Sequence, residues 1–420
     1  MDRVNDLADH LMQQAVPSRT IMIDPTSDQT DPFFQLSEDS DWNACIGPQG
    51  SEENYADGYI EAAIELVSAV IEKSMYERRD TLILPILYTA RHSIELALKL
   101  AIGELVKMRI IDQLHAKNHD ILSHWQLLDR TVLGDATVRR IVTEIEPFIR
   151  SLSQVDDDGQ GLRYHEKQDG QRSLADKPLA NLLVVRASLD KLADLLKQLK
   201  FRVFDLTYER STGSYTRDCS RRDLFEIAKM LPQIGQWNSE QFDVAKRAVC
   251  EQFGIGSRKF SDALNVIKVN REMKVLLGEE TALSHLSDDS VLFVVEQWRL
   301  RHPRRQGGRN PLGFDHFDPE RFAEMAEESR IAAGVNQNVV EKLSSEEIAD
   351  LQTVYYMGRD KVFAEHYQAV LERTAKTQRL AGNAVLSVNH LMEKTNFLTS
   401  LASGLRRLGR PSLAERVSAL

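Results

Sequence analysis

Apolar residues recur every three to four positions along most of the chain after Tyr55, which is the spacing of amphipathic helices. The most apolar stretch, residues 81–104 (TLILPILYTARHSIELALKLAIGE), leaves little room for a solvated face. Within it His92, Glu95 and Lys99 stand at i, i+3 and i+7, so one side of a helix would carry all three. Because Glu and Lys are rarely buried unless paired, this strip predicts either a wet groove or a buried ion pair that holds helices in register.

The same periodicity predicts an all-α protein, with an antiparallel helical bundle followed by a helical C-terminal region. A loop rich in Gly and Asp is expected between Val155 and Gly170. Helices of the bundle are expected at 55–78, 81–104, 119–133, 137–152 and 179–204. Later helices are expected at 222–231, 239–253, 258–269, 281–298, 318–333, 344–356 and 359–380, followed by two that Gly404 and Gly409 punctuate.

Shifts in composition divide the chain into four expected segments. Residues 1–54 form an acidic N-terminal extension, in which residues 1–15 favour a short amphipathic helix and no Lys or Arg occurs between Thr20 and Asn54. The helical bundle covers 55–205, a small helical domain 206–300, and a C-terminal helical domain 301–420. The last boundary is placed at the basic, Gly- and Pro-containing link RLRHPRRQGGRN, residues 299–310.

The net charge of −10 and the pI near 5.7 argue against a protein that coats nucleic acid or an anionic membrane, although a local basic patch remains compatible. Cys45, Cys219 and Cys250 lie far apart without a CxxC pair, which fits a reducing compartment and gives no metal signal. The N-terminus is polar, and no apolar run reaches the ~18–20 residues of a membrane helix. A soluble cytoplasmic protein without cofactor is expected.

Several short motifs follow one another in the bundle. They are Arg91-His92-Ser-Ile-Glu95-Leu-Ala-Leu-Lys99, then His119-Asp-Ile-Leu, then Trp125, then Leu162-Arg163-Tyr164. In this succession residues 55–200 resemble the HEPN superfamily. The resemblance implies a helical bundle, frequent homodimers and a polar site in a groove between helices. Many members are metal-independent ribonucleases of phage defence or toxin–antitoxin pairs, often encoded beside a partner protein, whereas others bind nucleotides or partners without catalysis.

The chain departs from the catalytic HEPN pattern, which is an Arg followed four to six residues later by a His on a late helix of the bundle. No such pair lies between Asp156 and Lys200. Arg163 and His165 stand too close, and Arg109 and His115 fall in an expected loop. Two functions therefore stay open: an RNA-binding or RNA-cleaving protein of bacterial defence or stress response, and a non-enzymatic helical adaptor that dimerises and binds a partner or a nucleotide.

The first candidate site contains five candidate catalytic residues. His119 joins them as a residue that would contact the RNA. A His can act as general acid or base, Lys and Arg can bind a phosphate, and a carboxylate can orient them. The 2′-hydroxyl of RNA is itself a nucleophile, so cleavage needs no metal. The alternative is a buried network that locks helix packing. The five residues are His92, Glu95, Lys99, Arg163 and Tyr164.

Two further groups are candidates for nucleic-acid contact. The link carries Arg301, Arg304, Arg305 and Arg309, which could follow a phosphate backbone, although such runs are usually solvated links. Arg359 and His366 would share one face of the expected helix 359–380, where ordinary salt links are the alternative.

A third function is a DNA-binding regulator. Residues 239–269 are typical of a helix-turn-helix, with a turn at Phe253-Gly-Ile-Gly and a basic second helix. Helix pairs of this kind are common in any α-protein. Histidines form neither an HExxH motif nor a cluster with cysteines, and the chain lacks GxxxxGK[ST] and GxSxG, so no metal or nucleotide cofactor is expected.

Overall fold

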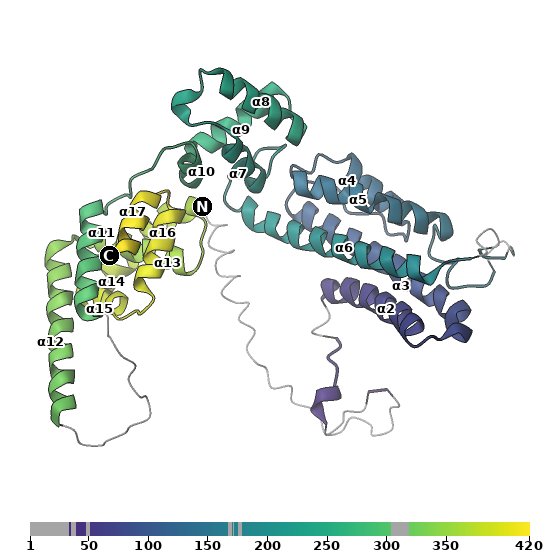
Figure 1. The fold of residues 1–420 in the computed structure, drawn as a ribbon, viewed down its shortest axis with the longest axis horizontal. Coiled ribbons are helices and arrows are strands. Elements are labelled where there is room, and N and C mark those ends of the chain that lie inside the picture. Colours follow the sequence, from purple (N-terminus) through teal and green to yellow (C-terminus); the bar gives the residue numbers. More distant parts are fainter. Residues whose placement is uncertain are drawn as a thin grey trace. The chain divides into compact units, whose positions relative to one another are not determined.

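The computed structural model describes residues 33–34, 39–47, 51–166, 170, 172–174, 179–303 and 319–420. The chain divides into two units, Met1–Ser51 and Glu52–Leu420. Among the described residues all regular structure is helical, apart from one isolated bridge between Glu166 and Arg172 (Figure 1), which confirms the all-α class. In the first unit only the short helix η1 (Ser40–Trp42) is described, and the helix expected at 1–15 lies outside the described residues.

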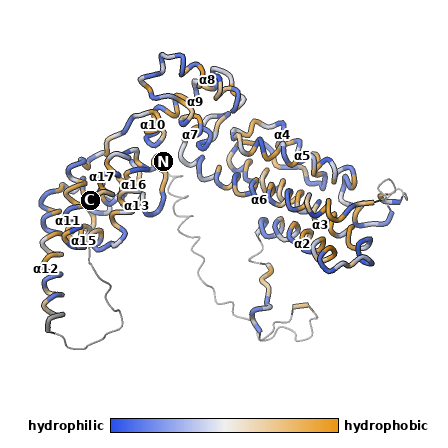
Figure 2. Tube along the Cα trace, in the orientation of Figure 1, coloured by the Kyte–Doolittle hydropathy of each residue, from blue (hydrophilic) through white to orange (hydrophobic). Residues whose placement is uncertain are grey.

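Helix α3 (Arg79–Lys107) is the centre of the first hydrophobic core. It packs against the four other helices of the bundle. Its side chains Ile94, Leu98, Ile102 and Leu105 are completely buried in that core, and apolar residues concentrate along it (Figure 2). The predicted central helix is therefore present. The helices around it are α2 (Glu52–Glu72), α4 (Ile121–Arg130), α5 (Ala136–Val155) and α6 (Leu182–Arg210).

Two more hydrophobic cores follow along the chain. The smaller contains α7 (Arg221–Met230), η3 (Ile234–Gln236), α8 (Glu240–Phe253), α9 (Ser257–Val269) and α10 (Arg271–Leu276). The larger begins at Leu283 and contains α11 (Asp288–Arg301), α12 (Pro319–Lys342), α13 (Ser345–Arg359), α14 (Tyr367–Ala381), α15 (Ala384–Met392), α16 (Phe397–Arg407) and α17 (Pro411–Ala419).

The expected domain boundary at 300/301 lies inside the larger core. Val294, Val295 and Trp298 of α11 are buried together with residues of α13 and α16. The change from one core to the next falls instead between Leu277 and Leu283. The division of the chain into domains as such stays a prediction.

Several helix boundaries differ from the predictions; α12, for example, ends at Lys342 rather than at Ala333. Helix α6 continues past Phe204 to Arg210, because Leu206 is buried and Arg202 pairs with Glu209 in the last turns at 2.6 Å. Helix α11 begins at Asp288 rather than Thr281, where the Ser287 side chain caps its first turn. It then continues through Arg301, so the predicted link starts inside a helix.

The prediction of a single helix at 359–380 is wrong. Helix α13 ends at Arg359, a short 3-10 helix η4 (Ala364–His366) follows, and α14 begins at Tyr367. Lys361 adopts a left-handed backbone with φ +54°, and the amide of Val362 donates to the carbonyl of Met357 at 3.1 Å. These contacts end α13 and turn the chain, so Arg359 and His366 lie on different helices.

A buried ion network joins the end of the bundle to the start of the second core. The Arg202 guanidinium lies 2.7 Å from Asp135 and donates to the Ser220 hydroxyl at 3.2 Å. Asp223, in the first turn of α7, accepts from the amide of Ala136 at 3.0 Å. Burial, together with the charge of Asp135, raises the pKa of Asp223 to about 6. Beside this network Cys219 is fully buried, and burial raises the pKa of its thiol to about 12.

Helices α13 and α16 cross at two glycines, Gly358 and Gly404. A Cβ atom on Gly358 would collide with the carbonyl of Ser400 and the backbone of Gly404, and one on Gly404 would collide with the carbonyl of Val354. Gly404 therefore does not punctuate a helix, as the sequence suggested, but lies inside α16 as a packing position. The crossing brings the C-terminal ends of α13 and α16 together.

We expect Gly358→Ala to lower the free energy of unfolding by at least ~1–3 kcal/mol, because the added methyl group can be accommodated only if two backbones move apart. Chemical denaturation measures the change. Gly334→Ala is the matched control: it lies on α12 with open space around it. There alanine should stabilise by roughly 0.5–1 kcal/mol. Equal stabilities of Gly358→Ala and wild type would contradict this packing.

Candidate functional site

Glu95 is the centre of the predicted polar strip. Its side chain is 2% exposed, and its Oε1 accepts from Lys99 Nζ at 2.6 Å and from His119 Nδ1 at 2.9 Å. Its Oε2 lies 3.5 Å from Arg91 Nη1 and 3.8 Å from His92 Nδ1. The structure therefore brings together His92, Glu95 and Lys99 on α3, and adds His119 from the segment before α4.

Arg91 is the residue that sequence reasoning missed, although the quoted motif contains it. It is 1% exposed and donates from Nε to the carbonyl of Asp156 at 2.7 Å. Its Nη2 donates to the carbonyls of His119 at 2.5 Å and Asp157 at 3.2 Å. The spacing Arg-x-x-x-Glu-x-x-x-Lys on an apolar helix was the available signal, because residues four apart on a helix are neighbours.

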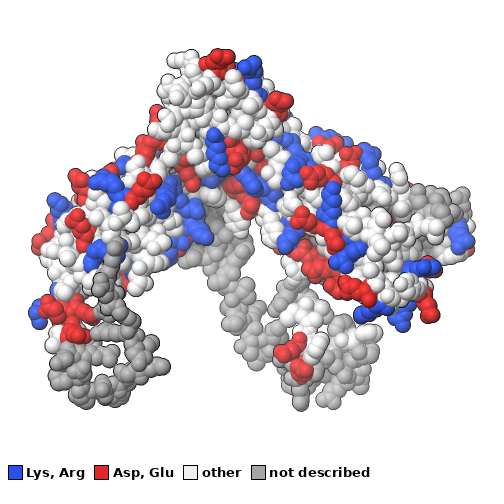
Figure 3. All heavy atoms as spheres, in the orientation of Figure 1, with Lys and Arg blue, Asp and Glu red and all other residues white. Residues whose placement is uncertain are grey.

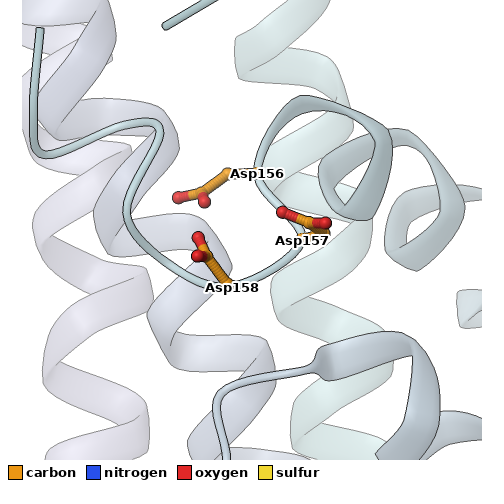
Figure 4. A group of neighbouring side chains, drawn as sticks. All are labelled: Asp156, Asp157 and Asp158. Carbon is orange, nitrogen blue, oxygen red and sulfur yellow. The ribbon is translucent and has the colours of Figure 1, made fainter. Parts of the chain in front are cut away.

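The Asp156–Asp158 turn follows α5 and carries three carboxylates whose oxygens lie within 4.8 Å of one another (Figure 4). Such a group could offer oxygen ligands to a hard cation. However, Asp156 already accepts from the amides of Gly161 at 2.9 Å and Leu162 at 3.2 Å, and lies 3.9 Å from Arg91. Its carboxylate therefore closes the loop around Arg91, and the turn gives no argument for a metal.

Arg163 reaches the strip through the aromatic ring of Tyr88, and Tyr164 contacts Arg163. The guanidinium of Arg163 lies 5.6 Å from the ring centre of Tyr88 and 5.5 Å from that of Tyr164. Tyr88 stacks on His92 with 5.9 Å between the ring centres. Within the described part of the chain, neither Arg163 nor Tyr164 forms a hydrogen bond or ion pair with Glu95 or Lys99. Arg163 was expected in one site with the strip, and the structure links it to the strip through Tyr88, which sequence reasoning also missed.

The charge of Glu95 determines which ring nitrogen of a neutral His119 carries the proton. Burial alone would raise the pKa of Glu95, but His92, Lys99 and His119 outweigh it and hold that pKa well below its ordinary value. An ionised Glu95 can only accept, so the Nδ1 atom of a neutral His119 carries the proton. The Nε2 atom then keeps a free lone pair. Because the His119 side chain is 59% exposed, the imidazole is available to a ligand.

His124 in α4 is a further buried histidine that sequence reasoning missed. His124 is 1% exposed, and its Nε2 is buried without a hydrogen-bond partner among the described residues. Its ring contacts that of His115 edge-on at 5.3 Å. Burial and the nearby charge of Lys99 lower the pKa of His124, so it is neutral near pH 7.

The other predicted nucleic-acid contacts do not gather at this site. Arg304, Arg305 and Arg309 lie outside the described residues. Arg301 is used within the larger core, where it donates to Asn389 at 3.0 Å and pairs with Glu393 at 3.3 Å. Arg359 pairs with Asp360 at 2.6 Å. His366 lies 3.4 Å from the hydroxyl of Ser211.

Comparison of the chain with protein-family models, curated proteins and solved structures found no match. Among the described residues, no helix combines the length and the apolar character needed to cross a membrane. The geometry of the Glu95 site therefore carries the functional argument by itself.

We expect Glu95→Gln to lower the free energy of unfolding at pH 7 by ~3–5 kcal/mol, because Arg91 and Lys99 lose the carboxylate that balances them. The folded-state pKa of Glu95 is depressed, so its contribution is complete above about pH 4.5 and declines as the pH falls toward the folded-state pKa. The difference between wild type and variant should therefore shrink below pH 4.5. Denaturation at pH 7 and pH 3.5 measures it, and a pH-independent difference would exclude ionised Glu95 as the cause.

Proposed function

We propose that the Glu95 site binds RNA, that His119 acts as general base in its metal-independent cleavage, and that the chain is a HEPN-like protein of bacterial defence or stress response. The observation that supports this proposal is the pairing of a buried carboxylate with an exposed imidazole. A carboxylate that fixes Nδ1–H of a histidine leaves Nε2 oriented and basic, which is the arrangement of many acid–base sites.

The chemistry requires only groups that the cluster contains. His119 Nε2 takes the proton of a ribose 2′-hydroxyl, whose oxygen attacks the adjacent phosphorus. The bond from phosphorus to the 5′-oxygen breaks, and that oxygen takes a proton from His92, the second imidazole beside Glu95. The products are a 2′,3′-cyclic phosphate and a 5′-hydroxyl. Lys99 and Arg163 supply the positive charge that favours binding of the phosphate.

A non-enzymatic adaptor is the second candidate, and burial favours it. Arg91, Glu95 and Asp156 have side chains that are 2% exposed or less and satisfy one another. This is the behaviour of a packing lock, which an adaptor binding a protein partner or a nucleotide would also need. Under this alternative the exposed His119 has no chemical task. The homodimer and a partner protein encoded nearby stay predictions.

The DNA-binding alternative has weaker support. Helices α8 and α9 are joined at Gly254–Gly256 and both pack on α7, as a helix-turn-helix requires. However, Lys259 of α9 pairs with Asp218 at 2.6 Å, and Lys268 lies 4.7 Å above the ring centre of Trp237. Two cations of the expected recognition helix are therefore engaged within the protein.

Cleavage of total RNA and tRNA in the presence of EDTA tests the proposal. We expect the wild type to cleave and His119→Asn to lose roughly 10²–10⁴-fold in rate, the usual contribution of a general base. His165→Asn is the matched control, since His165 is exposed and only 3.7 Å from Glu166, away from Glu95. It should cleave like wild type. Equal rates for all three proteins, or no cleavage by any, would leave the adaptor as the better explanation.

A further inference from the structure

The ends of α13 and α16 hold four cations, here called the C-terminal basic patch. The patch consists of Arg359 and Lys361 at the end of α13 and Arg406 and Arg407 at the end of α16. The glycine crossing brings these helix ends together, and Arg407 Nη1 donates to the carbonyl of Val362, next to Lys361, at 3.5 Å. Lys and Arg side chains gather over α16 and its surroundings (Figure 3).

The charge of this part of the chain differs in sign from the whole. Residues 355–420 contain ten Lys and Arg against five Asp and Glu, whereas the complete chain has a net charge of −10. Within the patch Asp360 pairs with Arg359, which leaves Lys361, Arg406 and Arg407 in excess. A local excess of cations on an acidic protein is the electrostatic pattern of a surface for a polyanion.

Lys361 stands where the backbone favours glycine. It has φ +54° two residues after the end of α13. The ends of three other helices use Gly254, Gly382 and Gly409 at positive φ, whereas Ser74 and Arg109 adopt φ +48° and +57° after α2 and α3. A side chain in this conformation is unfavourable relative to glycine. The helix dipole favours a cation anywhere in the last turn, and Arg359 already supplies one there. Folding therefore does not require a lysine at 361, and the exposed side chain of Lys361 adds a cation to the surface of the patch.

We propose that the C-terminal basic patch binds the phosphate backbone of RNA, as a contact additional to the Glu95 site. Lys and Arg that neutralise phosphates release condensed counterions, which makes such binding strongly salt-dependent and independent of base sequence. The proposal rests on the proposed function for the identity of the polyanion. The chemistry of the patch itself specifies only consecutive phosphodiesters.

The first test uses Lys361→Gly and a fluorescein-labelled 20-nucleotide single-stranded RNA. Glycine relieves the left-handed backbone and removes the charge, so we expect a higher melting temperature together with weaker RNA binding. A merely structural lysine predicts a change in melting temperature with unchanged binding. Unchanged RNA binding, with either a higher or a lower melting temperature, would overturn the proposal.

The second test removes three charges together. Lys361→Gln/Arg406→Gln/Arg407→Gln should bind the RNA roughly tenfold more weakly near physiological salt, and should lower the magnitude of the slope of log affinity against log salt by about 2. The matched control is Arg373→Gln/Lys376→Gln/Arg379→Gln, which removes the same charge from the exposed side of α14. It should bind like wild type. Equal losses in both triple variants would show a net-charge effect and overturn the patch.

Two outcomes separate this inference from the proposed function. In the first outcome, His119→Asn loses cleavage while the patch variant has the same RNA affinity and the same salt dependence as the control. The cleavage site then stands and the patch falls. If the patch variant loses binding while no preparation cleaves RNA, the patch stands and the proposed cleavage falls. Tighter binding of a 20-base-pair DNA duplex than of the RNA would overturn RNA as the polyanion.

Discussion

The bundle depends on one carboxylate that is almost completely removed from water. Glu95 balances the equally buried Arg91 and the mostly buried Lys99, and an unpaired charge in that position would cost several kcal/mol. Arg91 in turn holds the backbone carbonyls of His119 and Asp156, which lie in two different loops. The packing of α3 and the paths of both loops are thus fixed by the same few charges.

The buried and the exposed halves of this network have different consequences. Arg91, Glu95 and Asp156 face one another, and their contacts explain the order of the loops without any ligand. His119 is different, because the contact that orients its ring leaves most of the side chain in solvent. A purely structural network would have no need for an exposed imidazole held at one nitrogen. The same carboxylate can therefore stabilise the fold and prepare a reactive group.

The sequence named both the strip and the loop residues of the site, but it determined only the contacts that lie within one helix. The strip of His92, Glu95 and Lys99 followed from helix geometry, because it needs only one helix. The contact from His119 depends on the path of the chain between α3 and α4, which no local pattern determines. Arg163 was expected in one site with the strip, but it packs on Tyr88, whose role as an aromatic bridge has no sequence signal.

The same limit explains the error at the end of α13. Helices usually stop at Gly or Pro, and the segment between Arg359 and Tyr367 contains neither. A lysine in a left-handed conformation ends the helix there, which propensity alone would not anticipate. The hydrophobic cores were more predictable than the boundaries between them. Apolar residues such as Trp298 and Val354 are expected to be buried whatever their context, whereas the path of the backbone between helices depends on tertiary contacts.

Cys219 gives the protein a built-in reporter of opening. Its thiol is sealed inside the smaller core, and only the thiolate reacts with alkylating reagents. It lies beside the Arg202 network, so any fluctuation that separates the bundle from α7 would also expose the sulfur. The speed at which iodoacetamide marks this one atom would then record how often that junction breaks in the otherwise intact molecule.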